Sequence, residues 1–98
     1  MSATAGVANV LNLKPVVKHV NMDEVMQVEA VECATLAVRR HKTEKDIANF
    51  IKREFDNKHT PNWNCIVGRN FGTAVAHEKN RFIYMILGDI AIQLWKSV

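Results

Sequence analysis

Cysteine is scarce in this sequence: there are two cysteines, Cys33 and Cys65, and no C-x-x-C pair. Two thiols so far apart indicate neither a disulfide framework nor a zinc site. We expect both to be small buried apolar residues, Cys33 in a helix and Cys65 in a strand.

Long apolar runs are also absent, because no stretch is long enough and free enough of charge to span a bilayer. The leader MSATAGVANVLNL lacks the basic start and unbroken apolar centre of a secretory signal. It is rich in Ala, Asn and Thr without a period, so we expect residues 1–13 to form a flexible tail before a domain over 14–98. With the scarce cysteines, this predicts a reducing, intracellular location and no membrane contact.

Charged residues of one sign are not clustered anywhere in the sequence. The net charge is +3, but lysine and arginine are spread from Lys14 to Lys96 among acidic residues. A nucleic-acid-binding domain more often concentrates them on one stripe, so a solvated surface is the favoured interpretation and no nucleic-acid partner is expected. The 98 residues suffice for one domain with a small core, which is consistent with added stability from a partner subunit.

The apolar pattern begins with a short strand over 16–20 that follows Lys14-Pro15, where proline suggests a sheet edge. Asn21 and Glu24 then resemble a capping box and predict a helix to about Arg40. Helical spacing predicts its apolar face, made of Met22, Val25, Met26, Ala30, Cys33, Leu36 and Ala37.

Thr43 and the acidic residues after it predict the start of a second helix, which should end near His59 before Thr60-Pro61. Beyond it the pattern changes to β, with strands expected over 63–68, 71–77, 81–87 and 90–96. Gly88-Asp89 predicts a tight hairpin between the last two. The order predicts an α+β fold with helices packed on a mostly antiparallel sheet.

Residues for catalysis are sparse, and no spacing suggests a metal site or a cofactor. Cys65 and His77 fall on neighbouring predicted strands, but no nucleophile signature accompanies Cys65. The glycine-rich stretch 68–72 joins two strands and opens no helix, so it is better interpreted as a turn than as a phosphate loop. A Cys/His hydrolase is the weakest alternative.

Residues 73–76 are all small, although they fall in the most β-like part of the chain. They would leave room above the sheet, and an unpaired edge there could accept an extended peptide. They could equally fit tightly under a helix, and the pattern alone leaves both interpretations open.

Several motifs favour the peptide groove over tight packing under a helix. VECAT at 31–35, EKDIA at 44–48, IKREFD at 51–56, CIVGRNFG at 65–72, HE at 77–78, FIY at 82–84 and KS at 96–97 strongly resemble the eight-kilodalton cytoplasmic dynein light chain family. The resemblance covers nearly everything after Lys14. It implies a non-catalytic, cytoplasmic and cytoskeleton-associated homodimeric hub, without a cofactor, with two helices and a five-stranded sheet completed by strand exchange.

The resemblance also implies partners and site residues. The partners would be the dynein intermediate chain and other disordered peptide motifs, added as a strand beside 71–77. The implied peptide-binding residues are Glu44, Lys45, Asn70, Phe71, Gly72, Thr73, Ala74, Val75, Ala76, His77, Phe82, Tyr84 and Ala91. The implied dimer-interface residues are Asn64, Thr73, Val75 and Ser97, of which Ser97 matches a family phosphorylation position.

The chain departs from the family pattern at Ala74, Ala76, Ile86 and Gln93, where the family has larger or different side chains. Each lost hydrogen bond to a peptide costs about 0.5 to 1.5 kcal/mol, so the usual Thr-Gln-Thr ligand should bind weakly. The alternative function is therefore a divergent paralogue with its own peptide specificity, acting as a dimerisation scaffold independent of the motor. Asn64 replaces a family histidine, which predicts a dimer less sensitive to acid.

Overall fold

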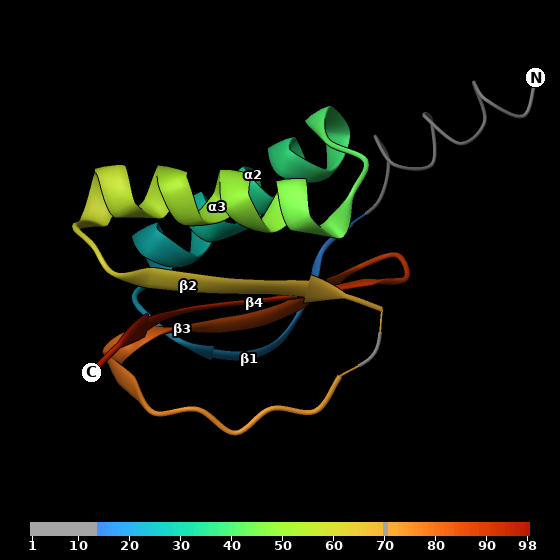
Figure 1. The fold of residues 1–98 in the computed structure, drawn as a ribbon. Coiled ribbons are helices and arrows are strands. Elements are labelled where there is room, and N and C mark those ends of the chain that lie inside the picture. Colours follow the sequence, from blue (N-terminus) through green and yellow to red (C-terminus); the bar gives the residue numbers. More distant parts are fainter. Residues whose placement is uncertain (1–13, 70) are drawn as a thin grey trace, which may run out of the picture.

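The computed structural model describes residues 14–69 and 71–98. Two helices cover one face of an antiparallel sheet, and a non-helical segment crosses below the other face (Figure 1). The predicted tail, 1–13, lies outside the described residues. The elements, in chain order, are β1 (Val16–Asn21), α2 (Glu24–Arg40), α3 (Glu44–His59), β2 (Trp63–Gly68), β3 (His77–Leu87) and β4 (Ile90–Ser97).

The N-cap of helix α2 lies two residues after Asn21, the predicted cap. Asp23 is the N-cap, and its carboxylate accepts a hydrogen bond from the Met26 amide at 2.8 Å. Asn21 is instead the last residue of β1, where its side-chain oxygen accepts from the Asn80 amide. The predicted apolar face is also wrong at Val25, which is 73% exposed because it lies on the solvent side of the first turn.

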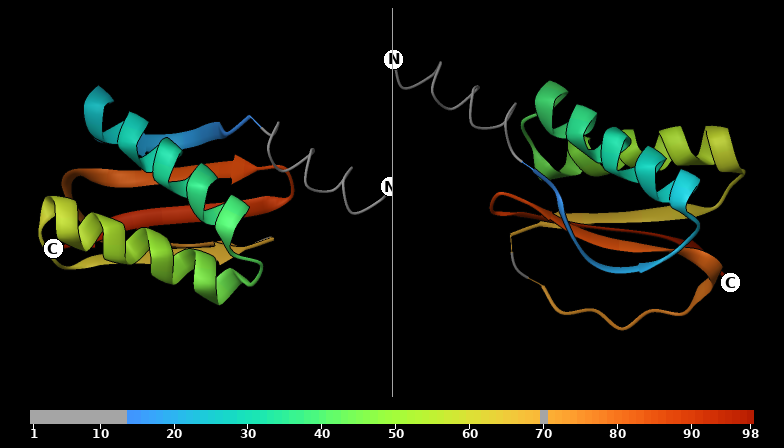
Figure 2. Two further views of the ribbon diagram at one scale, coloured as in Figure 1. Left: turned by 90° about the horizontal axis from the view of Figure 1, so that it is seen from above. Right: turned by 180° about the vertical axis from the view of Figure 1, so that it is seen from behind.

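The observed bounds of helix α3 confirm the prediction that it starts after Thr43 and ends near His59. The hydroxyl of Thr43 accepts from the Asp46 amide at 3.1 Å, and Ile47, Ile51 and Phe55 are buried at helical spacing. The two helices lie side by side over the sheet, with α3 on the β2 side (Figure 2).

The sheet has four strands in the order β1-β3-β4-β2, with every neighbouring pair antiparallel. The predicted hairpin at Gly88-Asp89 is present, and Gly88 has the positive φ, 63°, that this turn needs. The predicted 71–77 strand is wrong for the single chain, because residues 71–76 pair with no strand and His77 already belongs to β3. The expected fifth strand is thus missing from this sheet.

The core lies between the helices and the sheet. Ile83, Met85 and Leu87 of β3 and Ile92 and Leu94 of β4 are fully buried against α2 and α3. Strand alternation therefore turns Phe82, Tyr84 and Gln93 to the opposite face of the sheet.

Candidate peptide-binding site

Residues 71–76, which we call the strap, leave the sheet after β2 and return to it at His77. The strap bows away below the sheet in both side views (Figures 1 and 2). Its backbone has no hydrogen-bonded strand partner among the described residues. An extended backbone in this state offers N–H and C=O groups to another strand.

A cavity of about 250 Å³ lies between the strap and the helix-free face of the sheet. It gathers four predicted peptide-binding residues, Phe71, Thr73, Phe82 and Tyr84, together with His19 and Gln93. The rings of Phe71 and Tyr84 meet edge to face with centroids 5.8 Å apart, and His19 stacks on Tyr84 at 6.5 Å. These aromatic contacts give the cavity apolar walls.

Two residues of this cavity were not predicted as site residues. Gln93 was noted in the sequence only as a departure from the family pattern, and His19 only as a histidine without a ligand at helical spacing. The alternation of β4 was the available signal for Gln93, because this residue follows Ala91 at the two-residue spacing of one sheet face.

The other predicted peptide-binding residues lie around the cavity or away from it. The ring of His77 packs on Phe82 at 4.9 Å, and Val75 is half-buried. Ala74 and Ala76 of the strap are exposed to solvent, and Gly72 has open space where a side chain would lie. Ala91 is buried opposite Ile86 in the neighbouring strand, and Asn70 lies outside the described residues.

Glu44 and Lys45 are exposed in the first turn of α3, on the helix side of the sheet. Neither lines the cavity below the sheet. A single chain therefore does not bring them to the strap.

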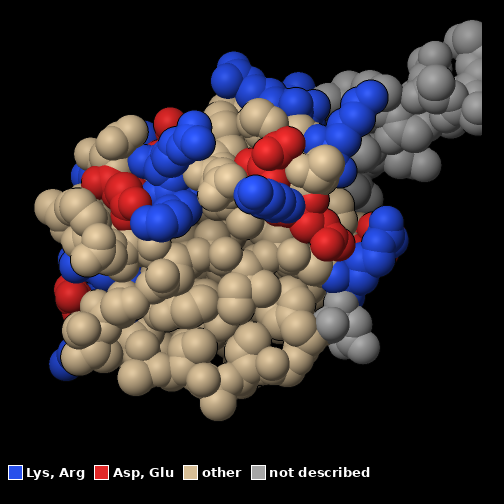
Figure 3. Space-filling view, viewed as in Figure 1, with Lys and Arg blue, Asp and Glu red and all other residues tan. Residues whose placement is uncertain are grey.

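The outer edge of β2 lacks the protection that edge strands usually carry. Neither β2, with the sequence WNCIVG, nor the strap contains a charged residue. The opposite edge strand, β1, carries Lys18 and has an irregular register between Val17 and His19, two features that discourage foreign strands. The space-filling view shows charged side chains over the helices and an uncharged surface over β2 and the strap (Figure 3).

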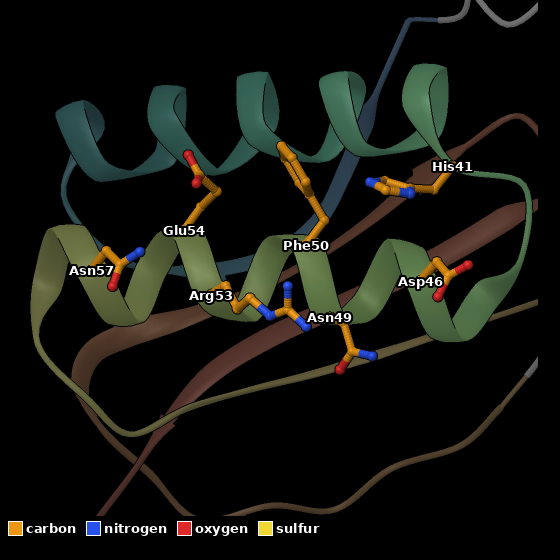
Figure 4. Close-up of a pocket in the computed structure, with 7 residues that line it drawn as sticks. All are labelled: His41, Asp46, Asn49, Phe50, Arg53, Glu54 and Asn57. Carbon is orange, nitrogen blue, oxygen red and sulfur yellow. The ribbon is translucent and has the colours of Figure 1, made fainter.

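A second hollow, of about 360 Å³, runs along the outer side of the helices. Its lining residues are His41, Asp46, Asn49, Phe50, Arg53, Glu54 and Asn57. Phe50 and Glu54 point toward α2, whereas Asn49 and Arg53 point away from it (Figure 4). None of the predicted site residues lies here, and the hollow carries no nucleophile beside a base.

The Cys65 and His77 side chains do not meet. Cys65 packs against the core on the helix side of the sheet, whereas the His77 ring contacts Phe82 on the cavity side. Burial raises the pKa of the Cys65 thiol, which keeps it protonated at neutral pH and makes it a poor nucleophile. Within 14–69 and 71–98, no group of three or more His, Cys, Asp or Glu side chains could hold a metal ion.

The fold defines a class of α+β domain with two helices on one face of an antiparallel sheet, and comparison with known proteins identifies the family. The model of the family "Dynein light chain type 1" matches residues 14–97, so the chain belongs to the dynein light chain family. This family is non-catalytic, in agreement with the prediction from sequence.

Solved structures agree on the fold. The dynein light chain-like domain of the Fasciola hepatica calcium binding protein FhCaBP2 is 23% identical, with a TM-score of 0.81 over 91% of this chain and 96% of that one. The dynein light chain-like domain of CsTAL3 is 15% identical, with a TM-score of 0.70 over 84% of this chain and 90% of that one. Neither helix of the described chain is long and apolar enough to cross a membrane.

Proposed function

We propose that the chain is a homodimeric hub that binds short disordered peptide segments by strand addition. One observation carries the proposal: the same chain leaves the strap and the outer edge of β2 both unpaired and both uncharged. A single unprotected edge strand would promote aggregation. Two unpaired segments in the same chain can instead pair with each other between two copies, the strap of one copy with β2 of the other.

In the proposed dimer, the strap of each subunit pairs with β2 of the other. One side of the strap backbone faces that strand, and the other side remains open to a guest peptide. Six residues in extended form span about 20 Å, which is enough for several main-chain hydrogen bonds to a peptide. Glu44 and Lys45 do not reach the strap of their own chain. In the proposed dimer, Glu44 and Lys45 of the partner subunit would close the groove beside the strap.

Main-chain pairing supplies affinity in this arrangement, while alternate side chains of the peptide enter pockets and supply specificity. The cavity lined by Phe71, Phe82 and Tyr84 is the pocket for one such side chain. Two equivalent grooves would hold two partner chains in parallel and raise their avidity through effective concentration.

Family membership supports a cytoplasmic, cytoskeleton-associated role as a light chain of the dynein motor, with the dynein intermediate chain as one partner. A motor-independent dimerisation scaffold with altered specificity is the second candidate. It is favoured by Ala74 and Ala76, which are exposed on the strap and carry no side-chain hydrogen-bonding group. Calorimetric titration with a family-typical Gln-Thr peptide separates the two, because the second candidate should bind it weakly.

The dimer is tested by placing a charge on the uncharged edge. Ile66 of β2 is 37% exposed, and Ile66→Lys should prevent pairing of two subunits. Val28→Lys on α2 is the matched control, since Val28 is also an exposed aliphatic residue, at 56%. Sedimentation velocity should show a monomer for Ile66→Lys and a dimer for Val28→Lys and the unmodified chain.

Hydrogen exchange of the strap provides the second measurement. Strand exchange should protect amides of residues 73–76 in the dimer and leave them unprotected in the Ile66→Lys monomer. A dimer whose strap amides exchange as fast as an unfolded chain would show that the subunits associate through another surface.

A further inference from the structure

Helices α2 and α3 leave a groove between them on the surface that faces away from the sheet. Three hollows follow one another along it: the hollow of about 360 Å³ described above, one of about 200 Å³ and one of about 390 Å³. The first two share Phe50 and Glu54, which point toward α2 (Figure 4), and the last two share Glu29. The three hollows are therefore continuous, and we call them the interhelical groove.

The floor of the interhelical groove is apolar. Phe50 and Leu36 are half-buried beside the buried Cys33. At one end of the groove, the Phe50 and His41 rings have centroids 5.4 Å apart, and the Arg40 guanidinium lies 6.0 Å from the centre of the Phe50 ring. Partly exposed apolar side chains between two helices form a surface on which another amphipathic segment can pack.

The rims of the interhelical groove are acidic. Six carboxylates line its hollows against one arginine and one lysine, although the whole chain has a net charge of +3. The six are Asp23, Glu24, Glu29, Glu32, Asp46 and Glu54. Glu29 lies 3.0 Å from the His59 ring, whereas Glu32 and Glu54 form no ion pair within 14–69 and 71–98. Acidic rims beside an apolar floor are complementary to a basic amphipathic partner.

The helices on both sides of the groove determine the form of that partner. They satisfy their own N–H and C=O groups, so they offer an extended segment no strand with which to pair. A segment that lies here must satisfy its own backbone, as a helix does. The carboxylates would repel phosphate groups of nucleic acids or lipids. Residues 1–13 of the chain contain no lysine or arginine, so they match the acidic rims less well.

We propose that the interhelical groove is a docking surface for a basic amphipathic helix of a partner protein. The apolar side of that helix packs on Phe50 and Leu36, and its lysines or arginines face Glu29, Glu32 and Glu54. The groove lies within one subunit, on the opposite side of the sheet from the strap (Figure 1). This interaction therefore goes beyond the proposed function and does not require the dimer.

The test uses three labelled sixteen-residue peptides, which match the length of α3. The first has leucines at helical spacing and lysines at its polar positions, the second has glutamates in place of the lysines, and the third has the composition of the first in an order without an apolar face. Fluorescence anisotropy measures their binding to the unmodified full chain. The first peptide should bind, and the other two should bind at least about tenfold more weakly.

Two variants test the rim and the floor separately. Glu32→Lys should weaken binding of the first peptide about three- to tenfold, because an attraction becomes a repulsion. Asp89→Lys is its control, since it makes the same charge change at an exposed carboxylate in the turn between β3 and β4. Leu36→Gln should also weaken binding about three- to tenfold. Its control is Val28→Gln, which changes an exposed aliphatic residue of α2 outside the groove. Circular dichroism checks that all four variants are folded.

Several results would overturn this proposal. They are no binding of the first peptide, equal binding of all three peptides, and equal weakening by Glu32→Lys and Asp89→Lys, which is expected if only the overall charge matters. Association of the unmodified chain beyond a dimer that Leu36→Gln abolishes would show that a second copy occupies the groove instead.

The Ile66→Lys variant distinguishes this proposal from the proposed function. It should bind the first peptide as well as the unmodified chain does. Loss of binding in Ile66→Lys would assign the peptide to the groove of the proposed dimer and would overturn this inference. An unmodified chain that is a monomer and still binds the first peptide would overturn the proposed function and leave this inference standing.

Discussion

The side-chain amide of Asn64 donates a hydrogen bond of 2.6 Å to the hydroxyl of Ser97. The bond joins β2 to the end of β4, beside the uncharged edge that we propose to pair with a partner strap. Neither group titrates near neutral pH, so the contact keeps the same charge across the physiological range.

This contact predicts that mild acid leaves the proposed dimer intact. Asn64→His should create a dimer that weakens as the pH falls from 7 to 5, because a histidine with an ordinary pKa of about 6.5 becomes charged in a buried contact. Sedimentation at both pH values checks this. His19 and His77 lie on the same side of the sheet, so the comparison is between the variant and the unmodified chain; dissociation of both at pH 5 would contradict the prediction.

A negative charge at Ser97 should oppose assembly. Ser97→Glu mimics a phosphate at the end of the uncharged edge, where pairing with a partner would remove the charge from water. We expect the dimer Kd to rise on the order of tenfold. Ser97→Gln is the neutral control of the same size, and a dilution series by sedimentation equilibrium measures both. Equal weakening by the two variants would show that size rather than charge is responsible.

The carboxylate of Asp56 should stabilise the junction between α3 and β2. It accepts from the Trp63 amide at 2.7 Å and from the Lys52 ammonium at 2.6 Å. Desolvation acts to raise the Asp56 pKa, but these hydrogen bonds and the lysine charges outweigh it and lower the pKa below 3.8. Its stabilisation is therefore present above the unfolded-state pKa and is lost as the pH falls through the folded-state value.

Asp56→Ala should reduce the free energy of unfolding at pH 7 by about 1.5 to 3 kcal/mol, the usual range for hydrogen bonds to a charged group. The loss relative to the unmodified chain should shrink below about pH 4. Urea unfolding at fixed protein concentration, at pH 7, 5 and 3, measures it. Lys52→Met removes only the exposed ion pair and should cost less than about 0.5 kcal/mol. A penalty for Asp56→Ala that is constant with pH would rule out a role for the charge.

Both thiols should react slowly in the native protein. Burial raises the pKa of Cys33 to about 12 and also raises that of Cys65. Labelling with a mild aromatic disulfide at pH 8 should be at least about a hundredfold slower in the native protein than in urea, because only the thiolate reacts. Cys33→Ala assigns the remaining signal to Cys65. Rapid labelling of native Cys65 would reopen the question of a reactive site.

The helices and the four strands of the sheet follow from local pattern, because capping residues, apolar spacing and β-branched residues act over a few neighbours. Thr43 and the buried Ile47, Ile51 and Phe55 are an example. Strand β3 differs in its start, at His77 rather than at the predicted residue 81. Asn21 and Asp23 are both competent caps, and the choice between them is made by the pairing of β1 with β3, which sequence pattern does not contain.

The largest difference between the predicted strands and the single chain lies in the strap. Residues 71–77 have the alternation of a strand, but a strand needs a partner, and no partner for 71–76 exists within the described chain. The site was predicted only in part for a similar reason. Phe71, Phe82 and Tyr84, which the family resemblance implied, line one cavity, and their role in peptide binding stays a prediction. The missing partner of the Gln93 amide, whose buried Nε2 has no hydrogen bond to any described residue, becomes visible only when the neighbours of each atom are known.

The uncharged edge of β2 has a consequence for how this protein is made. In the proposed dimer, a newly synthesised subunit would expose the edge of β2 until it meets a second copy, and this edge has no lysine to discourage pairing with other proteins. The time it spends alone is set by how often two copies meet, so scarce expression should lose more molecules to aggregation and quality control than abundant expression. A higher cellular concentration would therefore reduce the fraction of subunits lost before they pair.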